Sequence, residues 1–265
     1  DWFARVAKEF PKSLRAEVAL YMNARCQMWR TRSSEYTQQD RQVVEGERPK
    51  AKKLFEEYMA KFPKGRHFGD ALGWYAALAF DGKDFATALR YYLQQLDLAD
   101  HPELHDMAAI MVERTLSHLA SEPRDKAFAE VAKHPRAALA LVYLVVNTSE
   151  SDNYNGEYDS IETVRGWRKA VLPKLAAALS SQAKLYQNAE WKPRQLAMLV
   201  FALSGAGQQE QALKLLQTAG AAESDDLLLA RGVVNHRAKQ PAEAAAALQT
   251  LVEKYPDSPL AKGAR

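Results

Sequence analysis

Apolar residues recur at intervals of three and four along much of the chain, in segments joined by short polar turns. Residues 70–96 show the pattern clearly, as two apolar stripes on either side of the polar turn 81–84. Residues 194–219 and 226–255 repeat this arrangement. Spacings of three and four place side chains on one face of an α-helix. We therefore predict three helical hairpins, each made of two helices and a tight turn.

Proline residues follow the ends of several apolar segments. Pro11, Pro63 and Pro256 each come directly after an aromatic residue that closes such a segment. Proline cannot continue a helix, and it pushes the residue before it out of the helical region. We expect a helix to end at each of these prolines. Ser13 and Ser258, two residues after a proline, are predicted to cap the helices that follow.

Amino-acid composition favours helices throughout. The chain has 265 residues, with 45 Ala and 31 Leu but only 15 Val and 2 Ile. Ala and Leu favour helices, whereas β-branched residues favour strands. No window approaches the run of about 18 apolar residues that a membrane-spanning helix needs. The single cysteine, Cys26, excludes a disulfide within the chain and a multi-cysteine metal site. We predict an all-α protein.

The last hairpin resembles the tetratricopeptide repeat family. That family pairs a small residue on the first helix with an alanine, a large residue and a closing proline, in repeats of about 34 residues. Here these residues are Gly232, Ala244, Leu248 and Pro256. The small residue lets the two helices approach, and the large one fills the neighbouring gap. Less complete matches are Ala76, Ala88 and Tyr92; Val200, Ala212 and Leu216; and Ala51, Phe55 and Pro63.

The resemblance implies a tetratricopeptide-like α-solenoid, because an unstacked hairpin leaves one apolar face bare. We expect repeats over residues 1–100, the first of them with a long first helix, and over residues 191–265. Residues 101–190 keep no clear register and are expected to form degenerate hairpins with a polar loop at 148–159. Their apolar segments predict helices near 103–120, 124–133, 135–147 and 160–182.

In this family, first-helix positions that avoid the hairpin interface face a groove that binds a segment of a partner. By that analogy the groove residues are Asp70, Trp74, Ala77 and Asp81, then Arg194, Met198 and Phe201, then Asp226, Val233, His236 and Arg237. The resemblance implies a protein–protein interaction scaffold that binds another protein or peptide and needs no cofactor. The family's clamp for C-terminal carboxylates requires Lys, Asn and Arg at such positions, so the aspartates found here do not fit that ligand.

The loop at 151–162 resembles an EF-hand calcium loop. Its ligand positions include Asn153, Asn155, Asp159 and Glu162. Ser151 replaces the usual first aspartate, so only two of these ligands carry charge and the affinity for a dication should be low. The preferred interpretation is a solvated loop with a turn at Asn155 and Gly156, and calcium binding is the weaker candidate.

No catalytic constellation is visible in the sequence. His101 and His105 flank the helix-starting Pro102, so they do not share one helical face as a zinc motif requires. Ser181-Gln182-Ala183-Lys184 has the Ser-x-x-Lys pattern but lacks the motifs that accompany it in penicillin-recognising enzymes. We predict that the chain is not an enzyme. The alternative is the helical accessory domain of an envelope enzyme, such as one that processes peptidoglycan.

The net charge of +3 is too small to indicate a nucleic-acid partner. Residues 71–160 carry 7 basic and 14 acidic side chains, a local balance of −7, which could attract a basic partner. Solvated helix faces are the preferred explanation of this distribution.

The proline-containing stops at residues 10–13 and 255–258 resemble those of bacterial envelope proteins with tetratricopeptide repeats. By that resemblance we expect a periplasmic location and a role in envelope assembly or secretion, with the cytoplasm as the alternative compartment. The stripe that includes Trp2 and Phe3 is typical of a second helix, and its first helix is not present. We therefore also expect the chain to be an excerpt from a longer repeat array.

Overall fold

The computed structural model describes residues 2–31, 38–98, 102–119, 121–147, 161–187, 191–218 and 224–263. All regular secondary structure in these ranges is helical, which confirms the all-α prediction. The chain forms two compact units, residues 1–118 (unit 1) and 119–265 (unit 2). None of the described helices is both long enough and apolar enough to cross a membrane.

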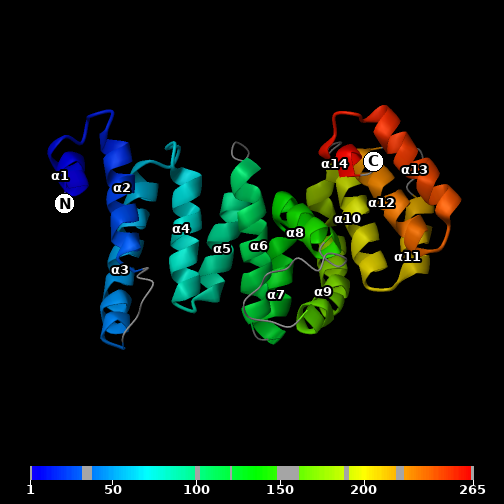
Figure 1. Cartoon of the computed structure of the whole chain (residues 1–265), viewed down its shortest axis with the longest axis horizontal. Coiled ribbons are helices and arrows are strands. Elements are labelled where there is room, and N and C mark those ends of the chain that lie inside the picture. Colours follow the sequence, from blue (N-terminus) through cyan, green and yellow to red (C-terminus); the bar gives the residue numbers. More distant parts are fainter. Residues whose placement is uncertain are drawn as a thin grey trace. The chain divides into compact units, whose positions relative to one another are not determined.

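Unit 1 is a succession of helices in which each contacts the next one along the chain. They are α1 (Trp2–Glu9), α2 (Ala16–Trp29), α3 (Gln38–Lys61), α4 (Phe68–Asp81), α5 (Phe85–Leu96) and α6 (Pro102–His118) (Figure 1). One core cluster joins α2, α3 and α4, and its largest fully buried side chains are Met28, Phe55 and Tyr58. The α4–α5 pair is the hairpin that the apolar pattern of residues 70–96 predicts.

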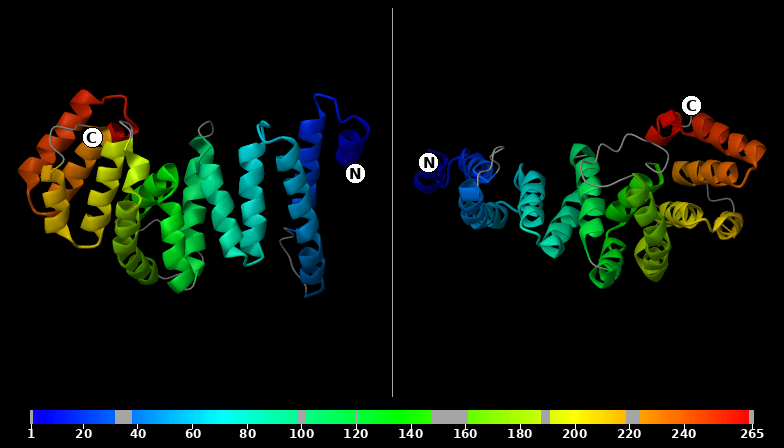
Figure 2. Two further views of the ribbon diagram at one scale, coloured as in Figure 1. Left: turned by 180° about the vertical axis from the view of Figure 1, so that it is seen from behind. Right: turned by 60° about the horizontal axis from the view of Figure 1, so that its bottom comes forward.

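Unit 2 contains the other two predicted hairpins. Its helices are α7 (Ser121–Val131), α8 (Pro135–Asn147), α9 (Ile161–Ser181), the 3-10 helix η1 (Ala183–Tyr186), α10 (Trp191–Gly205), α11 (Gln209–Thr218), α12 (Asp225–Arg237), α13 (Pro241–Lys254) and α14 (Pro259–Gly263). The α10–α11 and α12–α13 pairs lie side by side (Figure 2). Because α10 contacts α8, α9, η1, α11 and α12, it lies at the centre of the unit.

The three predicted hairpins share one turn conformation. Each turn has one residue in the left-handed region: Lys83 (φ 61°), Gly207 (φ 79°) and Lys239 (φ 61°). In each, the N–H of the following residue donates to a carbonyl of the first helix at 2.9 Å, from Asp84 to Ala79, from Gln208 to Leu203 and from Gln240 to Asn235. This is the Schellman arrangement, which satisfies carbonyls that the end of a helix leaves unbonded.

The predicted close approach within the last hairpin is also present. A Cβ atom placed on Gly232 of α12 would lie only 2.6 Å from Cγ of Leu248 on α13. A side chain at position 232 would therefore force Leu248 to move, or the two helices to separate. The α4–α5 hairpin has a comparable approach at Gly73, where a Cβ atom would lie 2.6 Å from Nε2 of Gln95.

The helix ends match the proline prediction in most places. Helices α1, α3 and α13 end shortly before Pro11, Pro63 and Pro256. Ser258 caps α14 as predicted, because its Oγ accepts a hydrogen bond from the N–H of Leu260 at 3.2 Å. The prediction for Ser13 is wrong.

Helix α2 begins three residues after Ser13, and Arg15 at its N-cap position forms no side-chain cap. The Ser13 Oγ instead accepts from the N–H of Arg15, within the turn before the helix. Proline does not end every helix either. Pro49 lies inside α3 and Pro173 inside α9.

Candidate partner-binding face

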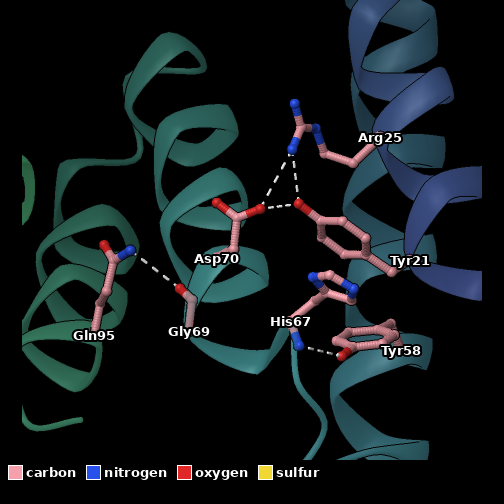
Figure 3. Close-up of polar contacts among 7 residues, drawn as sticks. All are labelled: Tyr21, Arg25, Tyr58, His67, Gly69, Asp70 and Gln95. Atoms are coloured by element: carbon pink, nitrogen blue, oxygen red, sulfur yellow. Dashed lines mark hydrogen bonds and ion pairs between the residues drawn. The ribbon is translucent and has the colours of Figure 1, made fainter. Parts of the chain in front are cut away.

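A polar and aromatic cluster joins the first helices α2 and α4 of unit 1 (Figure 3). Arg25 of α2 lies 3.3 Å from Asp70 of α4, measured from Nη1 to Oδ2. The same Nη1 donates to the Tyr21 hydroxyl oxygen at 2.7 Å, and the Tyr21 O–H donates to Asp70. Asp70 therefore accepts hydrogen bonds from two side chains of the neighbouring helix.

The Arg25 guanidinium also covers an aromatic ring. Its Cζ lies 4.5 Å from the centre of the Trp74 ring on α4. At this distance a guanidinium is attracted to the face of the indole. Burial lowers the pKa of Arg25, and its Nε is buried with no hydrogen-bond partner in the part of the chain that the structure describes. Asp70 and Trp74 thus hold Arg25 in one position.

A second set of contacts within the same cluster involves His67, Tyr58 and Glu17. The His67 ring stacks on the Tyr21 ring, with centres 4.4 Å apart and planes 8° from parallel. The N–H of His67 donates to the Tyr58 hydroxyl oxygen at 3.1 Å, and the Tyr58 O–H donates to Glu17 at 3.0 Å. Burial raises the pKa of Tyr58 and lowers the pKa of His67. Both side chains are therefore mainly neutral near pH 7. Their contacts hold His67, the residue directly before α4, in place.

Unit 2 contains a similar pair between its first helices α10 and α12. Arg194 lies 3.2 Å from Asp226, measured from Nε to Oδ2. Asp70 and Asp226 occupy the same position in their hairpins, six residues before Ala76 and Gly232 respectively. The Asp226 side chain is only 6% exposed, whereas that of Asp70 is 34% exposed. In both units an aspartate of the later first helix accepts from an arginine of the earlier one.

The predicted groove residues of unit 1 lie on one side of α4. Asp70 and Trp74 are half-buried because they contact α2. Ala77 is partly exposed and Asp81 is exposed. The C-terminal half of this side of α4 is thus the more accessible half.

The predicted groove residues of unit 2 differ in accessibility. Met198 and Phe201 are 0% and 1% exposed, so the prediction that they face a groove is wrong. They lie on α10, which other helices of the unit cover on several sides. Asp226 is buried as well, and Arg194 is half-buried against it. Val233, His236 and Arg237 of α12 keep exposed surface, and Arg237 donates to the Ser204 hydroxyl at 3.3 Å.

Helix α2 presents an exposed apolar stripe that the sequence analysis missed. Val18 is 43% exposed and Trp29 is 57% exposed, and Cys26 between them is exposed. Trp29 follows Arg25 by four residues, so it lies one turn further along the same side of α2. The signal in the sequence was the presence of two apolar stripes on this helix, of which only one is needed for the core.

The predicted calcium ligands Asn153, Asn155 and Asp159 lie outside the described residues, as does His101. Glu162 lies in α9, in a stretch whose side chains are not described. Among the described residues, no group of three His, Cys, Asp or Glu side chains is close enough to hold a metal ion.

Two open clefts of about 440 Å³ each lie in the described part of the chain. One is formed by α3, α4 and the turn between α4 and α5, and its lining includes Arg48, Lys52 and Tyr75. The other lies between α9, α10 and α11, and its lining is mainly apolar, including Leu199, Leu203 and Leu215. Neither lining brings a nucleophile together with a histidine.

Comparison with known proteins gives one match. Residues 226–258, which span α12 and α13, match the tetratricopeptide repeat family. No curated protein and no solved structure matches the chain. The matched segment contains Gly232, Leu248 and the closing Pro256, whose arrangement the structure reproduces. With its repeated hairpins and shared turn, the chain is a repeat protein of the tetratricopeptide type, an architecture typical of protein–protein interaction scaffolds.

Proposed function

We propose that the chain is a scaffold that binds a segment of a partner protein along one surface of unit 1. This surface, the α2–α4 face, consists of Cys26 and Trp29 of α2 and of Trp74, Ala77 and Asp81 of α4. The observation that carries the proposal is the exposed Trp29 one helical turn from Arg25, whose guanidinium lies over Trp74. Tryptophan and arginine are enriched among the residues that dominate binding energy at protein interfaces.

The α2–α4 face is organised before any partner binds. Asp70 and Tyr21 fix the guanidinium of Arg25, so little side-chain entropy is lost at this point on binding. Asp70 and Asp81 are the two charged residues of α4, and Asp70 forms an ion pair with Arg25. The charge that remains accessible on α4 is therefore the negative charge of Asp81. A fitting partner segment therefore has apolar anchor side chains for Trp29 and a basic residue near Asp81.

Cys26 allows a direct test, because it is the one cysteine of the chain and is exposed. A benzophenone attached to Cys26 should crosslink a partner from an extract of the source cells on illumination. The control is Cys26→Ser combined with Ala86→Cys, which moves the probe to an exposed position on α5. Trp29→Ala should reduce the crosslinking at Cys26.

Equal crosslinking from position 86, or no effect of Trp29→Ala, would show that the α2–α4 face is not the binding surface. Circular dichroism of each variant checks that its helices are intact.

We also propose that the scaffold works in the periplasm of a bacterium, in envelope assembly or secretion. The support is the likeness of the stops at residues 10–13 and 255–258 to those of bacterial envelope repeat proteins. Osmotic-shock fractionation of the source cells should release the native protein with the periplasmic fraction. Its retention with a cytoplasmic marker enzyme would refute this location.

A further inference from the structure

The cleft formed by α3, α4 and the turn between α4 and α5 has a basic wall, and we call it the basic cleft. Helix α3 contributes Arg48, Lys52 and Lys53 to its lining. Helix α4 contributes the opposite wall, with Tyr75 and Leu78, and Asp84 lies at the rim. All of these residues belong to unit 1.

The acidic side chains of the basic cleft already have partners in its walls. Glu56 accepts a hydrogen bond from the Tyr75 O–H at 2.6 Å. Asp84 caps α5, because its Oδ1 accepts a hydrogen bond from the N–H of Thr87. The Oδ2 of Asp84 lies 3.9 Å from Nζ of Lys52. These carboxylates therefore neutralise only part of the positive charge.

Two of the three basic side chains are not neutralised. Within the described part of the chain, neither Arg48 nor Lys53 takes part in an ion pair, and the Nε of Arg48 is buried without a hydrogen-bond partner. Burying a guanidinium N–H without an acceptor is unfavourable. A carboxylate is the acceptor that best fits a guanidinium, because its two oxygens match two parallel N–H groups.

We propose that the basic cleft binds an acidic peptide segment, with one carboxylate on Arg48 and the next on Lys52 and Lys53. Pro49 is exposed and gives the cleft an apolar surface for the aliphatic part of such a segment, whereas Leu78 and Ala79 in its lining are almost fully buried. The site is distinct from the α2–α4 face, because its basic side chains lie on α3, which contributes no residue to that face. It is also distinct from the family's carboxylate clamp, because the cations come from α3 and not from first-helix groove positions.

The test measures fluorescence anisotropy of a labelled oligoglutamate peptide mixed with the full chain. Arg48→Gln and Lys53→Gln should each weaken binding by about threefold or more, as expected for charge pairs at a partly exposed site. The matched control is Lys50→Gln, because Lys50 lies on the same helix, is exposed, forms its ion pair with Glu47 and does not line the cleft. This control should change the affinity by less than about 1.5-fold.

Three outcomes would overturn the proposal. The first is a failure of oligoglutamate to bind more tightly than oligoglutamine of the same length. The second is an equal loss of affinity in Lys50→Gln and Arg48→Gln, which would indicate attraction to the general charge of α3. The third is tighter binding of an oligothymidylate with the same dependence on Arg48 and Lys53, which would assign the cleft to nucleic acid. Because Lys53 is exposed and forms no ion pair with another described residue, its variant remains informative if Arg48→Gln does not fold.

Discussion

The two units link their first helices with the same pair of residue types but bury the pair to different extents. In unit 2, α10 and α12 pack directly on each other, and the Asp226 side chain beside Arg194 is 6% exposed. In unit 1, α2 and α4 are joined mainly by side chains, and Asp70 beside Arg25 is 34% exposed. The same aspartate position thus serves a closed junction in one unit and an accessible one in the other.

The hairpins differ in the chemistry of their closest contact. The α12–α13 hairpin of unit 2 is closed by an apolar contact between Gly232 and Leu248. In the α4–α5 hairpin of unit 1, Gly73 meets the amide of Gln95, whose Nε2 donates to the Gly69 carbonyl at 3.0 Å (Figure 3). The closest contact in the hairpin of unit 2 is therefore apolar packing, and that of unit 1 is supported by a buried side-chain hydrogen bond.

The largest difference should follow from removing the arginine of the buried pair. Arg194→Met leaves the Asp226 carboxylate buried without its arginine, which should lower the free energy of unfolding by about 3 kcal/mol. Urea denaturation followed by circular dichroism measures this change. Lys192→Met removes an exposed charge from the same helix and serves as the control. Equal effects of the two substitutions would mean that burial of Asp226 is not what distinguishes the units.

Gly232→Leu tests the apolar contact of unit 2. The new side chain would collide with Leu248, and overpacking of this kind costs about 1–3 kcal/mol or more. Gly46→Leu is the matched control, because Gly46 is also in a helix but a Cβ atom placed on it would have open space around it. A melting temperature that stays unchanged in Gly232→Leu would show that the α12–α13 contact tolerates a side chain.

Gln95→Leu tests the polar contact of unit 1. The substitution removes the donor to the Gly69 carbonyl while keeping a similar volume, so we expect a loss of about 1 kcal/mol. Hydrogen exchange should accelerate in α4 and α5 and stay unchanged in α12 and α13. Faster exchange in both hairpins would contradict the separation of the two units that the comparison assumes.

Arg25→Met is the counterpart of Arg194→Met in unit 1. Because Asp70 keeps a third of its side-chain surface in water and retains the Tyr21 O–H, the loss should be below about 1 kcal/mol. The same urea titration measures it. A loss as large as that of Arg194→Met would contradict the distinction between a closed and an accessible junction.

The smallest expected effect is a dependence of unit 1 on pH through His67. Burial lowers the folded-state pKa of His67 below its ordinary value, against an opposing contribution from Glu17. At a pH well above 6.5, the ordinary pKa of histidine, the side chain is neutral in both states. As the pH falls, the unfolded chain takes up the proton first, so stability decreases until the pH has passed the folded pKa. His67→Phe keeps the ring on Tyr21 and should reduce this decrease in urea denaturation at a series of pH values, whereas an unchanged profile would assign it to other groups.

Periodicity was enough to predict the hairpins, because a helix that buries one side must repeat apolar residues every three or four positions. The contact of Gly232 with Leu248 followed from the repeat motif. Met198 and Phe201 were misplaced because a position on a first helix does not reveal how many neighbouring helices cover it. The cluster of Tyr21, Arg25 and Asp70 was missed because Asp70 lies 45 positions after Arg25 and 49 positions after Tyr21. The sequence of a single chain carries no signal for a contact between residues so far apart.

The central place of α10 in unit 2 has a consequence for how the protein folds. In a strictly linear array each repeat gains stability only from its neighbours, so the ends can open while the rest stays folded. Helix α10 instead contacts α8, α9, η1, α11 and α12 at once, so those elements lose a shared partner together when it detaches. Unit 2 should therefore open in one cooperative step, whereas unit 1, where contacts run mainly from each helix to the next, can fray progressively from α1.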